Sequence, residues 1–454
     1  MTKIDTKSIF YHIFPLGACG CPKHNDFVSA PESRILQITE HLDRIQRLGC
    51  NAVLLGPVFE SSTHGYDTAN YDEVDRRLGS NADLAELSKE IHKRGMALVL
   101  DGVFNHVGRN FWAFKDVQNH GVHSAYKDWF SGLKFEGQSP YGDPFQYDCW
   151  QGYYELVKLN LYWPEVRAHL FEAVRMWKEV FQVDGLRLDA ADALNKEFIK
   201  ALRGFCGELD ADFWLMGELI HGDYREWVNP EMAHASTAYE LYKSAWSSFN
   251  EHNFFELSYS LNRQFGEGGI YRNLTTQYNF VDNHDLSRIA SILKNPKNLE
   301  ALHLLLFCEP GIPSIYYGSE FALQANKTQN DWELRPAFAL EQWCEDENGQ
   351  ALCPSITKFS ALRQRLPALQ NGEYCTRFSS LGQLAFTRSS LEQVVLIALN
   401  NMEESAAIKV PMQNMAGWKF RNALDETKDC FVGTEGWLEL KLEPNEGQIW
   451  VSSY

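Results

Sequence analysis

Arg187 and Asp189, near the middle of the chain, have the types and spacing of a charged catalytic pair. They stand at the end of an apolar strand in the segment GLRLDAADAL. A guanidinium beside a carboxylate favours the ionised acid and should lower its pKa, so we interpret Asp189 as a nucleophile. A buried pair of this kind is also a common structural feature, so the motif needs companions before it predicts chemistry.

Three further motifs place acids or imidazoles where an apolar strand meets a loop. DGVFNH covers residues 101–106, MGELI contains Glu218, and VDNHD ends at Asp285. Such a set could bind a divalent metal or cleave a glycosidic bond. A metal-dependent barrel hydrolase would normally show a His-x-His pair near its first strand, where this chain offers only His12. Glycoside cleavage is therefore the favoured interpretation.

Glycoside hydrolysis with retention needs two carboxyl groups about 5 Å apart, one ionised and one protonated. Asp189 would attack the anomeric carbon. Glu218 follows the apolar segment WLMG and faces other acids, so burial and like charge favour its protonated form and suit it to general acid/base catalysis. Asp285 would stabilise the oxocarbenium-like transition state, and His106 and His284 would donate hydrogen bonds to the same sugar. Each histidine alone would more often be a core residue, and only the joint pattern favours a site.

A repeated strand–loop–helix unit must position these residues. It runs from residue 8 to about residue 368, which is the pattern of a parallel sheet covered by helices. The first helix carries apolar residues at helical spacing from 38 to 48, and the second begins with a Ser80-x-x-Asp83 capping box. We expect strands at 8–14, 51–55, 96–103, 184–188, 213–216, 237–241, 278–281 and 314–317, and a last helix at about 356–365. Eight such units predict an α/β fold, the (β/α)8 TIM barrel, with its active site at the carboxyl ends of the strands.

Two segments depart from this repeat. Residues 107–156 are rich in glycine and aromatic residues and have no clear period, which predicts an inserted domain after the third strand. This insertion divides the barrel into residues 1–106 and 157–368. Residues 369–454 alternate apolar and polar side chains between hairpin signals, which predicts a C-terminal antiparallel β-sandwich domain. We interpret that domain as a packing module, with carbohydrate binding as the alternative.

Composition excludes several classes of protein. The 454 residues are 44% hydrophobic and 22% charged, as in an ordinary globular protein of two or three domains. A net charge of −18 without a basic cluster disfavours nucleic-acid partners and anionic membranes. The ten cysteines show no CxxC spacing, so we expect reduced core thiols rather than a zinc module. An N-terminus without a signal-peptide pattern favours a cytoplasmic location.

With these motifs the chain resembles the α-amylase family of retaining glycoside hydrolases, family thirteen, over residues 8–368. DGVFNH, GLRLDAADAL, GEL and VDNHD correspond in order to the four hallmark regions of that family. The resemblance implies that Asp189 is the nucleophile, Glu218 the acid/base and Asp285 the transition-state stabiliser. It also implies that the central sugar is bound by Tyr66, which would stack on it, and by Asp67, Asp101, His106, Arg187 and His284.

Within the family, LVKLN at residues 156–160 resembles the short motif of the cyclodextrin-degrading, neopullulanase and maltogenic branch. That branch holds the next sugar with an Asp and an Arg four residues apart after strand eight. Asp331 and Arg335 have this spacing, although alone they would equally be a surface ion pair.

The chain departs from that branch in three places. Its first barrel strand begins almost at once, where the branch usually carries an N-terminal β domain, which leaves the oligomeric state open. Ile220 stands where the branch usually has Trp, and the next residue, His221, becomes a candidate substrate-binding residue. Asp192 stands where Asn or Lys often lines the acceptor side. Many secreted amylases bind calcium through an asparagine at the position of Asn105, so calcium is an alternative to a site without metal.

The sequence thus predicts a cytoplasmic α-glucan hydrolase that cleaves α-1,4 bonds of short maltooligosaccharides or cyclodextrins and requires no cofactor. Two alternatives remain open. One is a transglycosylase or glucoside isomerase on the same scaffold, and the other is a non-catalytic sugar-binding relative.

Overall fold

A closed parallel barrel forms the centre of this computed structural model, which describes residues 3–272, 277–345 and 347–453. The strands are ordered β1-β13-β12-β11-β10-β9-β5-β2 around it, and every pair is parallel. Their bounds are β1 (Phe10–Ile13), β2 (Ala52–Leu55), β5 (Ala97–Gly102), β9 (Gly185–Leu188), β10 (Trp214–Gly217), β11 (Ala235–Thr237), β12 (Gln277–Asn279) and β13 (Ile312–Tyr316). The predicted α/β TIM barrel is confirmed.

The sixth strand lies earlier than the sequence predicts. We expected it at 237–241, but β11 ends at Thr237 and helix α7 (Tyr239–Asn250) begins two residues later. Tyr239 and Leu241 fit a strand by type, yet Leu241 is buried on the inner face of α7. A short apolar run does not distinguish a strand from the first turn of a helix, which explains this error.

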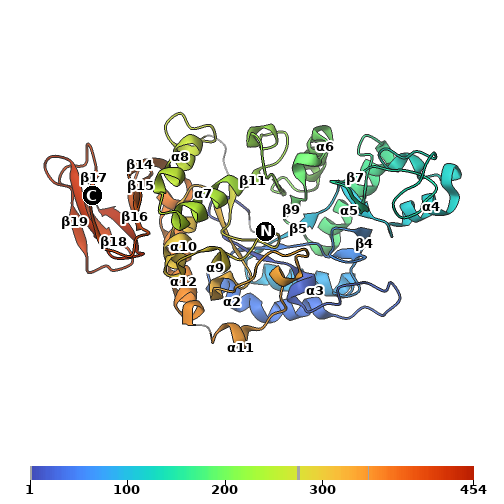
Figure 1. The fold of residues 1–454 in the computed structure, drawn as a ribbon, viewed down its shortest axis with the longest axis horizontal. Helices are drawn as coiled ribbons and strands as arrows, with labels where there is room; N and C mark the ends of the chain where they lie inside the picture. Colours follow the sequence, from blue (N-terminus) through green and yellow to red (C-terminus); the bar gives the residue numbers. More distant parts are fainter. Residues whose placement is uncertain (1–2, 273–276, 346, 454) are drawn as a thin grey trace.

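Helices surround the barrel (Figure 1). They are α1 (Pro15–Ala18), α2 (Leu42–Arg47), α3 (Asn81–Lys93), α5 (Pro164–Phe181), α6 (Lys196–Leu209), α7, α8 (Phe254–Phe265), α9 (Ile289–Ile292), α10 (Leu299–Cys308), α11 (Leu340–Trp343), α12 (Glu347–Arg365) and α13 (Pro367–Asn371). The predicted capping box begins α3, where Ser80 and Asp83 each accept a backbone N–H of the other. The helix expected at 38–48 is only partly α-helical, because a 3-10 helix, η1 (Arg34–His41), precedes α2.

The long segment after β5 carries its own small sheet. Strands β6 (His106–Gly108), β8 (Tyr153–Lys158) and β7 (Cys149–Trp150) pair antiparallel in that order, and helix α4 (Trp112–His120) packs beside them. Its glycine- and aromatic-rich sequence supplies a compact aromatic cluster that includes Phe114, Phe145 and Tyr147. Because β6 begins at His106, this sheet is joined directly to the motif DGVFNH.

The C-terminal region is the predicted antiparallel β domain, at the opposite end of the molecule from the inserted segment (Figure 1). One sheet has the order β14-β15-β16-β21-β18-β19 and a second pairs β17 with β20. The bounds are β14 (Glu373–Ser379), β15 (Gln383–Ser389), β16 (Val394–Asn400), β17 (Ala406–Pro411), β18 (Lys419–Asn422), β19 (Asp429–Phe431), β20 (Trp437–Leu442) and β21 (Gly447–Ser453). Strand β16 is buried along its whole length, since it contacts both α10 and β20, which explains its continuous run VVLIALN.

All ten cysteines are unpaired thiols. The expectation that they belong to the core is wrong for Cys344 and Cys375, which are exposed. Cys344 directly follows the short helix α11, and Cys375 lies on an exposed position of strand β14, which is at the edge of its sheet. In the part of the chain that the structure describes, no helix combines the length and the apolar character that crossing a bilayer requires.

Candidate active site

The four sequence motifs meet at the carboxyl ends of the barrel strands. Asp101 in β5 and Arg187 in β9 are register partners, so their side chains leave the barrel at the same level. The backbone N–H of Asp189 donates to Gly102 O (3.1 Å), and that of Glu218 donates to Leu188 O (3.0 Å). The parallel ladder thus continues one residue beyond the strands and fixes both acids side by side.

Arg187 lies at the centre of this cluster of acids and contacts three of them. It is 4% exposed, and its Nη1 lies 2.6 Å from Asp101 Oδ2 and 3.3 Å from Asp189 Oδ1. Its Nη2 lies 2.8 Å from Glu218 Oε1. A single guanidinium therefore binds three carboxylates, and the proposed nucleophile and acid/base are both within hydrogen-bonding distance of it.

Burial of the cluster reverses one expectation from the sequence, the lowered pKa of Asp189. Burial raises the pKa of Asp189 well above its ordinary value, and the charges of Glu218 and Asp101 raise it further against the opposing effect of Arg187. The sequence predicted a lowered pKa for Asp189, and this prediction is wrong because burial and the neighbouring acids outweigh the lowering effect of Arg187. Burial likewise raises the pKa of Asp101.

Asp285 is in a different electrostatic position. Although burial opposes it, His284, Arg335 and Arg187 hold the pKa of Asp285 well below its usual value. Arg335 Nη2 lies 2.8 Å from Asp285 Oδ1, and His284 Nε2 lies 3.0 Å from Oδ2. The backbone N–H of Asp285 also donates to Asn283 Oδ1 at 2.9 Å. Asp285 is therefore the acid of the cluster that stays ionised most firmly.

The side chain of Glu218 is held by a turn that sequence reasoning missed. Ala190, directly after the nucleophile, has φ 45° and ψ 47°, a left-handed conformation unfavourable for alanine. In this conformation its N–H donates to Glu218 Oε2 at 3.0 Å. Tyr239, the first residue of α7, donates its hydroxyl to Glu218 Oε1 at 3.3 Å and accepts from Asn283 Nδ2 at 3.1 Å. Ala190 and Asn283 lie in the motifs GLRLDAADAL and VDNHD, but neither motif indicates these contacts, and Tyr239 lies in no motif.

Aromatic and imidazole rings form another side of the cluster. Tyr66 donates its hydroxyl to Asp101 Oδ2 at 3.0 Å and is hydrogen-bonded to His284, with the two rings stacked at 5.7 Å. His12, which we had considered only as a metal ligand, packs edge-on against His284 at 5.0 Å. His106 Nε2 lies 4.0 Å from Asp189 Oδ2, and burial lowers the pKa of His106 to about 3, so its imidazole is neutral near pH 7.

Several buried polar atoms in this cluster have no hydrogen-bond partner. They are Asp101 Oδ1, Asn105 Oδ1, His106 Nε2 and His284 Nδ1. Buried donors and acceptors are almost always paired in folded proteins, so a concentration of unpaired ones indicates a place for a polar ligand. The mixture of donors and acceptors is suited to hydroxyl groups, which do both.

The remaining predicted residues lie at different distances from this cluster. Arg335 is 5% exposed and bridges Asp285 to Asp331 Oδ2 (3.4 Å), so the surface-pair interpretation is wrong. Both carboxylate oxygens of Asp67 accept hydrogen bonds from Thr63 in the same loop, at 3.1 and 2.8 Å. His221 is exposed, close enough to Asp192 for its charge to act on that carboxyl, and outside the cluster of acids.

A cavity of about 310 Å³ lies beside the acids, lined among others by Asn105, Trp150, Lys158 and Asp192. The ring of Trp150 is 5.7 Å from that of His106, and burial followed by the charge of Glu218 raises the pKa of Asp192.

The residues around Asn105 do not fit a calcium ion, which takes about six to eight oxygen ligands. Asn105 Oδ1 is an unpaired oxygen, but the ammonium of Lys158 lines the same cavity. Over residues 3–272, 277–345 and 347–453, no three His, Cys, Asp or Glu side chains are grouped as metal ligands.

Comparison with known proteins gives a consistent set of relatives. The profile of the α-amylase catalytic domain matches residues 35–445. The chain is 29% identical to a cyclomaltodextrinase of Geobacillus thermopakistaniensis over 395 residues, 84% of this chain and 64% of that protein. It is 30% identical to an intracellular maltogenic amylase of Bacillus subtilis over 348 residues, 76% of this chain and 56% of that protein. The solved structure of the cyclic α-maltosyl-(1→6)-maltose hydrolase of Arthrobacter globiformis superposes with a TM-score of 0.82 at 25% identity, over 99% of both chains. The chain therefore spans less than two thirds of the length of these two sequence relatives but 99% of this structural one.

Proposed function

The chain belongs to the α-amylase family, and from this premise we propose that it is a retaining hydrolase of α-1,4-linked glucans. The observation that carries the proposal is the convergence of Asp189, Glu218 and Asp285 beside a group of buried polar atoms without hydrogen-bond partners. A non-catalytic sugar-binding relative would have no need to bury an excess of carboxylates beside one guanidinium, because that arrangement is unfavourable to folding.

In the first step, the Asp189 carboxylate attacks the anomeric carbon and forms an ester bond to it. The bond from that carbon to the glycosidic oxygen breaks, and Glu218 donates its proton to the leaving oxygen. In the second step, Glu218 takes a proton from water, whose oxygen attacks the same carbon and displaces Asp189. Two inversions leave the product with the configuration of the substrate.

The placement of the two carboxyl groups supports retention. Glu218 and Asp189 both lie within 3.3 Å of nitrogens of the same guanidinium. Retaining enzymes hold their two carboxyls about 5 Å apart, whereas inverting enzymes leave roughly 6.5–9.5 Å for a water molecule between them. Two acids on one guanidinium fit the shorter separation.

The transition state is stabilised by charge and by donors fixed before the substrate arrives. Ionised Asp285 faces the positive charge that develops on the sugar ring, and Arg335 keeps it oriented. Neutral His106 offers its unpaired Nε2 to a hydroxyl, and Tyr66 offers a ring face for stacking. None of these groups has to reorganise during the reaction.

We propose short maltooligosaccharides or cyclodextrins as substrates. The site is rich in acids, which suits a neutral sugar, and the relatives include proteins named cyclomaltodextrinase and maltogenic amylase. A cytoplasmic location is part of the proposal, supported by ten unpaired cysteines and by the relative named as intracellular.

One observation favours a second candidate, transglycosylation. The 310 Å³ cavity beside the acids carries the aromatic face of Trp150 and the carboxyl of Asp192. An acceptor sugar bound there would compete with water for the covalent intermediate. Because both reactions share the first step, only the products distinguish them.

Product analysis tests these assignments. The purified protein is incubated with maltotriose, a cyclodextrin, pullulan, isomaltose, trehalose and sucrose, and products are followed by chromatography and proton NMR. We expect glucose or maltose from maltotriose and the cyclodextrin, with the α-anomer released first. Cleavage of isomaltose or sucrose alone would overturn the substrate assignment, and an initial β-anomer would overturn retention. Products longer than the substrate that precede free sugar would identify the transglycosylase.

A further inference from the structure

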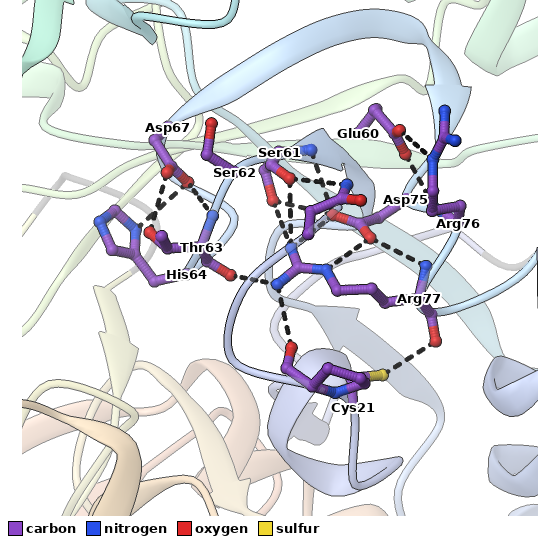
Figure 2. Close-up of polar contacts among 12 residues, drawn as sticks. Cys21, Glu60, Ser61, Ser62, Thr63, His64, Asp67, Asp75, Arg76 and Arg77 are labelled. Carbon is purple, nitrogen blue, oxygen red and sulfur yellow. Dashed lines mark hydrogen bonds and ion pairs between the residues drawn. The ribbon is translucent and has the colours of Figure 1, made fainter. Parts of the chain in front are cut away.

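Another buried arginine, Arg77, lies outside the cluster of acids and contacts the loop that carries Tyr66. Arg77 is 4% exposed and its partner Asp75 is 1% exposed. Figure 2 shows this pair, with Asp67 and His64 at one end of the polar contacts and Glu60 and Arg76 at the other. The pair directly follows a hairpin made of β3 (Phe59–Ser61) and β4 (Thr68–Val74).

Arg77 uses its whole guanidinium in this position. Its Nε and Nη2 donate to the two oxygens of Asp75, at 2.8 and 2.6 Å. The other N–H of Nη2 donates to Ser61 Oγ at 2.8 Å, and Nη1 donates to the backbone oxygens of Thr63 (2.7 Å) and Pro22 (3.1 Å). A lysine has three donors on one nitrogen and could not reproduce this planar set.

These bonds connect three parts of the chain that are distant in sequence. Pro22 follows α1, Ser61 ends β3 and Thr63 lies in the loop between β3 and β4, and Arg77 itself precedes α3. Cys21 reinforces the connection, because its thiol donates to Arg77 O at 3.1 Å. Arg77 thus binds both ends of this connection. Residues 61–67 are also held by Asn25, whose Nδ2 donates to Ser61 O (2.9 Å), and by Asn110, whose Nδ2 donates to Ser62 Oγ (3.0 Å).

The fixed loop leads directly to the active site. Thr63, whose carbonyl binds Arg77, donates its N–H and its hydroxyl to the two oxygens of Asp67. Gly65 then turns with φ +92°, where a Cβ would lie 2.6 Å from Pro57 Cβ. Tyr66 stands between Gly65 and Asp67, and its hydroxyl reaches Asp101. An unbroken chain of contacts therefore links Arg77 to Thr63, Thr63 to Asp67, and Asp67 to the adjacent Tyr66.

We propose that Asp75 and Arg77 are positioning residues that set the ring of Tyr66 against the central sugar. The proposal rests on the proposed function, since it assigns these residues to the same glycoside reaction. Asp67 acts in it as part of the loop, through Thr63, rather than through a sugar hydroxyl. The pair contacts no substrate, so its whole effect passes through the position of Tyr66.

The neighbouring pair Arg76–Glu60 provides a matched control. Arg76 Nε lies 2.5 Å from Glu60 Oε1, and its backbone N–H donates to Oε2 at 2.8 Å. Apart from Glu60, its side chain reaches only Ser29 O (3.4 Å) among the described contacts, and none in the loop from 61 to 67. Arg76 and Arg77 thus differ by one position in sequence and by their connection to Tyr66.

A double-mutant cycle tests the proposal. Arg77→Lys, Arg76→Lys, Tyr66→Ala and Arg77→Lys/Tyr66→Ala are compared by kcat/KM on maltotriose. We expect Arg77→Lys to lower kcat/KM by roughly 10- to 100-fold, since a displacement of about 1 Å can cost 100-fold, and Arg76→Lys by less than about 3-fold. In the Tyr66→Ala background, Arg77→Lys should lower it by less than about 3-fold. Equal losses in both backgrounds would overturn the proposal, because the effect would then not pass through Tyr66.

A second measurement separates this proposal from the proposed function. Hydrogen exchange of the amides in residues 61–68 should be faster in Arg77→Lys than in the unsubstituted protein and in Arg76→Lys. Unchanged exchange in that segment would overturn the proposal even if the enzyme is active. If the unsubstituted protein cleaves no glucan, the proposed function fails while the exchange comparison still judges the role of Arg77. Should Arg77→Lys not fold, Thr63→Val, which removes the hydroxyl contact to Asp67, replaces it in both measurements with a smaller loss expected.

Discussion

Arg187 and Arg77 are both 4% exposed and both bind carboxylates, but their surroundings differ in charge balance. Arg77 has one carboxylate partner, Asp75, and donors engaged on every side of its guanidinium. Arg187 is shared by Asp101, Asp189 and Glu218. The first arrangement is balanced and the second carries an excess of negative charge.

The difference shows how two similar pairs serve different purposes. A balanced, fully bonded pair fixes backbone segments, because any movement would leave a buried charge without a partner. An excess of buried acids is unfavourable to folding, but together with burial it raises the pKa of Asp189, and perturbed pKa values of this kind are typical of reaction sites. What distinguishes the proposed catalytic cluster from the structural pair is the number of acids for each guanidinium, since both contain a buried Asp–Arg pair.

The largest expected effect is on turnover at the unbalanced cluster. Asp189→Ala removes the nucleophile and Glu218→Gln removes the transferable proton, so each should lower kcat on maltotriose by a factor on the order of 10⁴. Because Asp189→Ala also removes an excess buried charge, its melting temperature should be equal to or above that of the unsubstituted protein. Calorimetry and steady-state kinetics on the same preparations check both statements. Turnover within about tenfold of normal in either variant would show that its assigned role is wrong.

Stability should respond in the opposite way at the balanced pair. Asp75→Asn leaves the charge of Arg77 buried without a counter-ion, and we expect the free energy of unfolding to fall by about 3–5 kcal/mol. The matched variant Asp189→Asn should not lower it at pH 7. The pKa of Asp189 is raised on folding, so its ionised form opposes folding above the unfolded pKa. Guanidinium chloride denaturation at pH 7 measures both, and equal losses would contradict the comparison.

The sequence predicted the positions of the acids better than the means by which they are held. Asp101, Asp189 and Glu218 lie at or directly after strand ends, which alternation and apolar runs locate to within a residue or two. The left-handed turn at Ala190 and the start of α7 at Tyr239 depend on tertiary contacts that no local pattern encodes.

The same limit applies to the segment VDRRLGS. Arg76 and Arg77 are identical in type and adjacent, and sequence alone gives no reason to bury one more than the other. Their difference arises because β3, β4 and the turn at Cys21 meet only in the folded chain. The burial of Asp189 and the number of acids around it are likewise properties of the folded chain, which is why the expected lowering of its pKa was wrong.

A smaller effect is expected in the pH dependence of the reaction. Asp189 must be ionised to attack, and its pKa is raised, so kcat/KM should fall with decreasing pH around an apparent value above 3.8, the ordinary value for this side chain. Rates from pH 3 to 8, with stability checked at each pH, measure this limb. An acid limb below 3.8 would mean that Arg187 outweighs burial and the other acids.

The smallest effect is expected in the C-terminal domain, far from both arginines. Trp437 and Phe431 are exposed aromatic residues there, at 46% and 61%. If the domain serves packing alone, Trp437→Ala and Phe431→Ala should each change kcat/KM on maltotriose by less than about twofold, as expected for surface positions. A larger change that is restricted to long glucans would instead favour carbohydrate binding by this domain.

Direct capture of the covalent intermediate tests the central claim. In Glu218→Gln, α-maltosyl fluoride needs no proton donor to lose fluoride, but the ester that forms on the enzyme lacks a base for its hydrolysis and should accumulate. Intact mass spectrometry followed by peptide mapping should place one maltosyl group on Asp189. An ester on another residue, or release of β-maltose without any ester, would contradict the account.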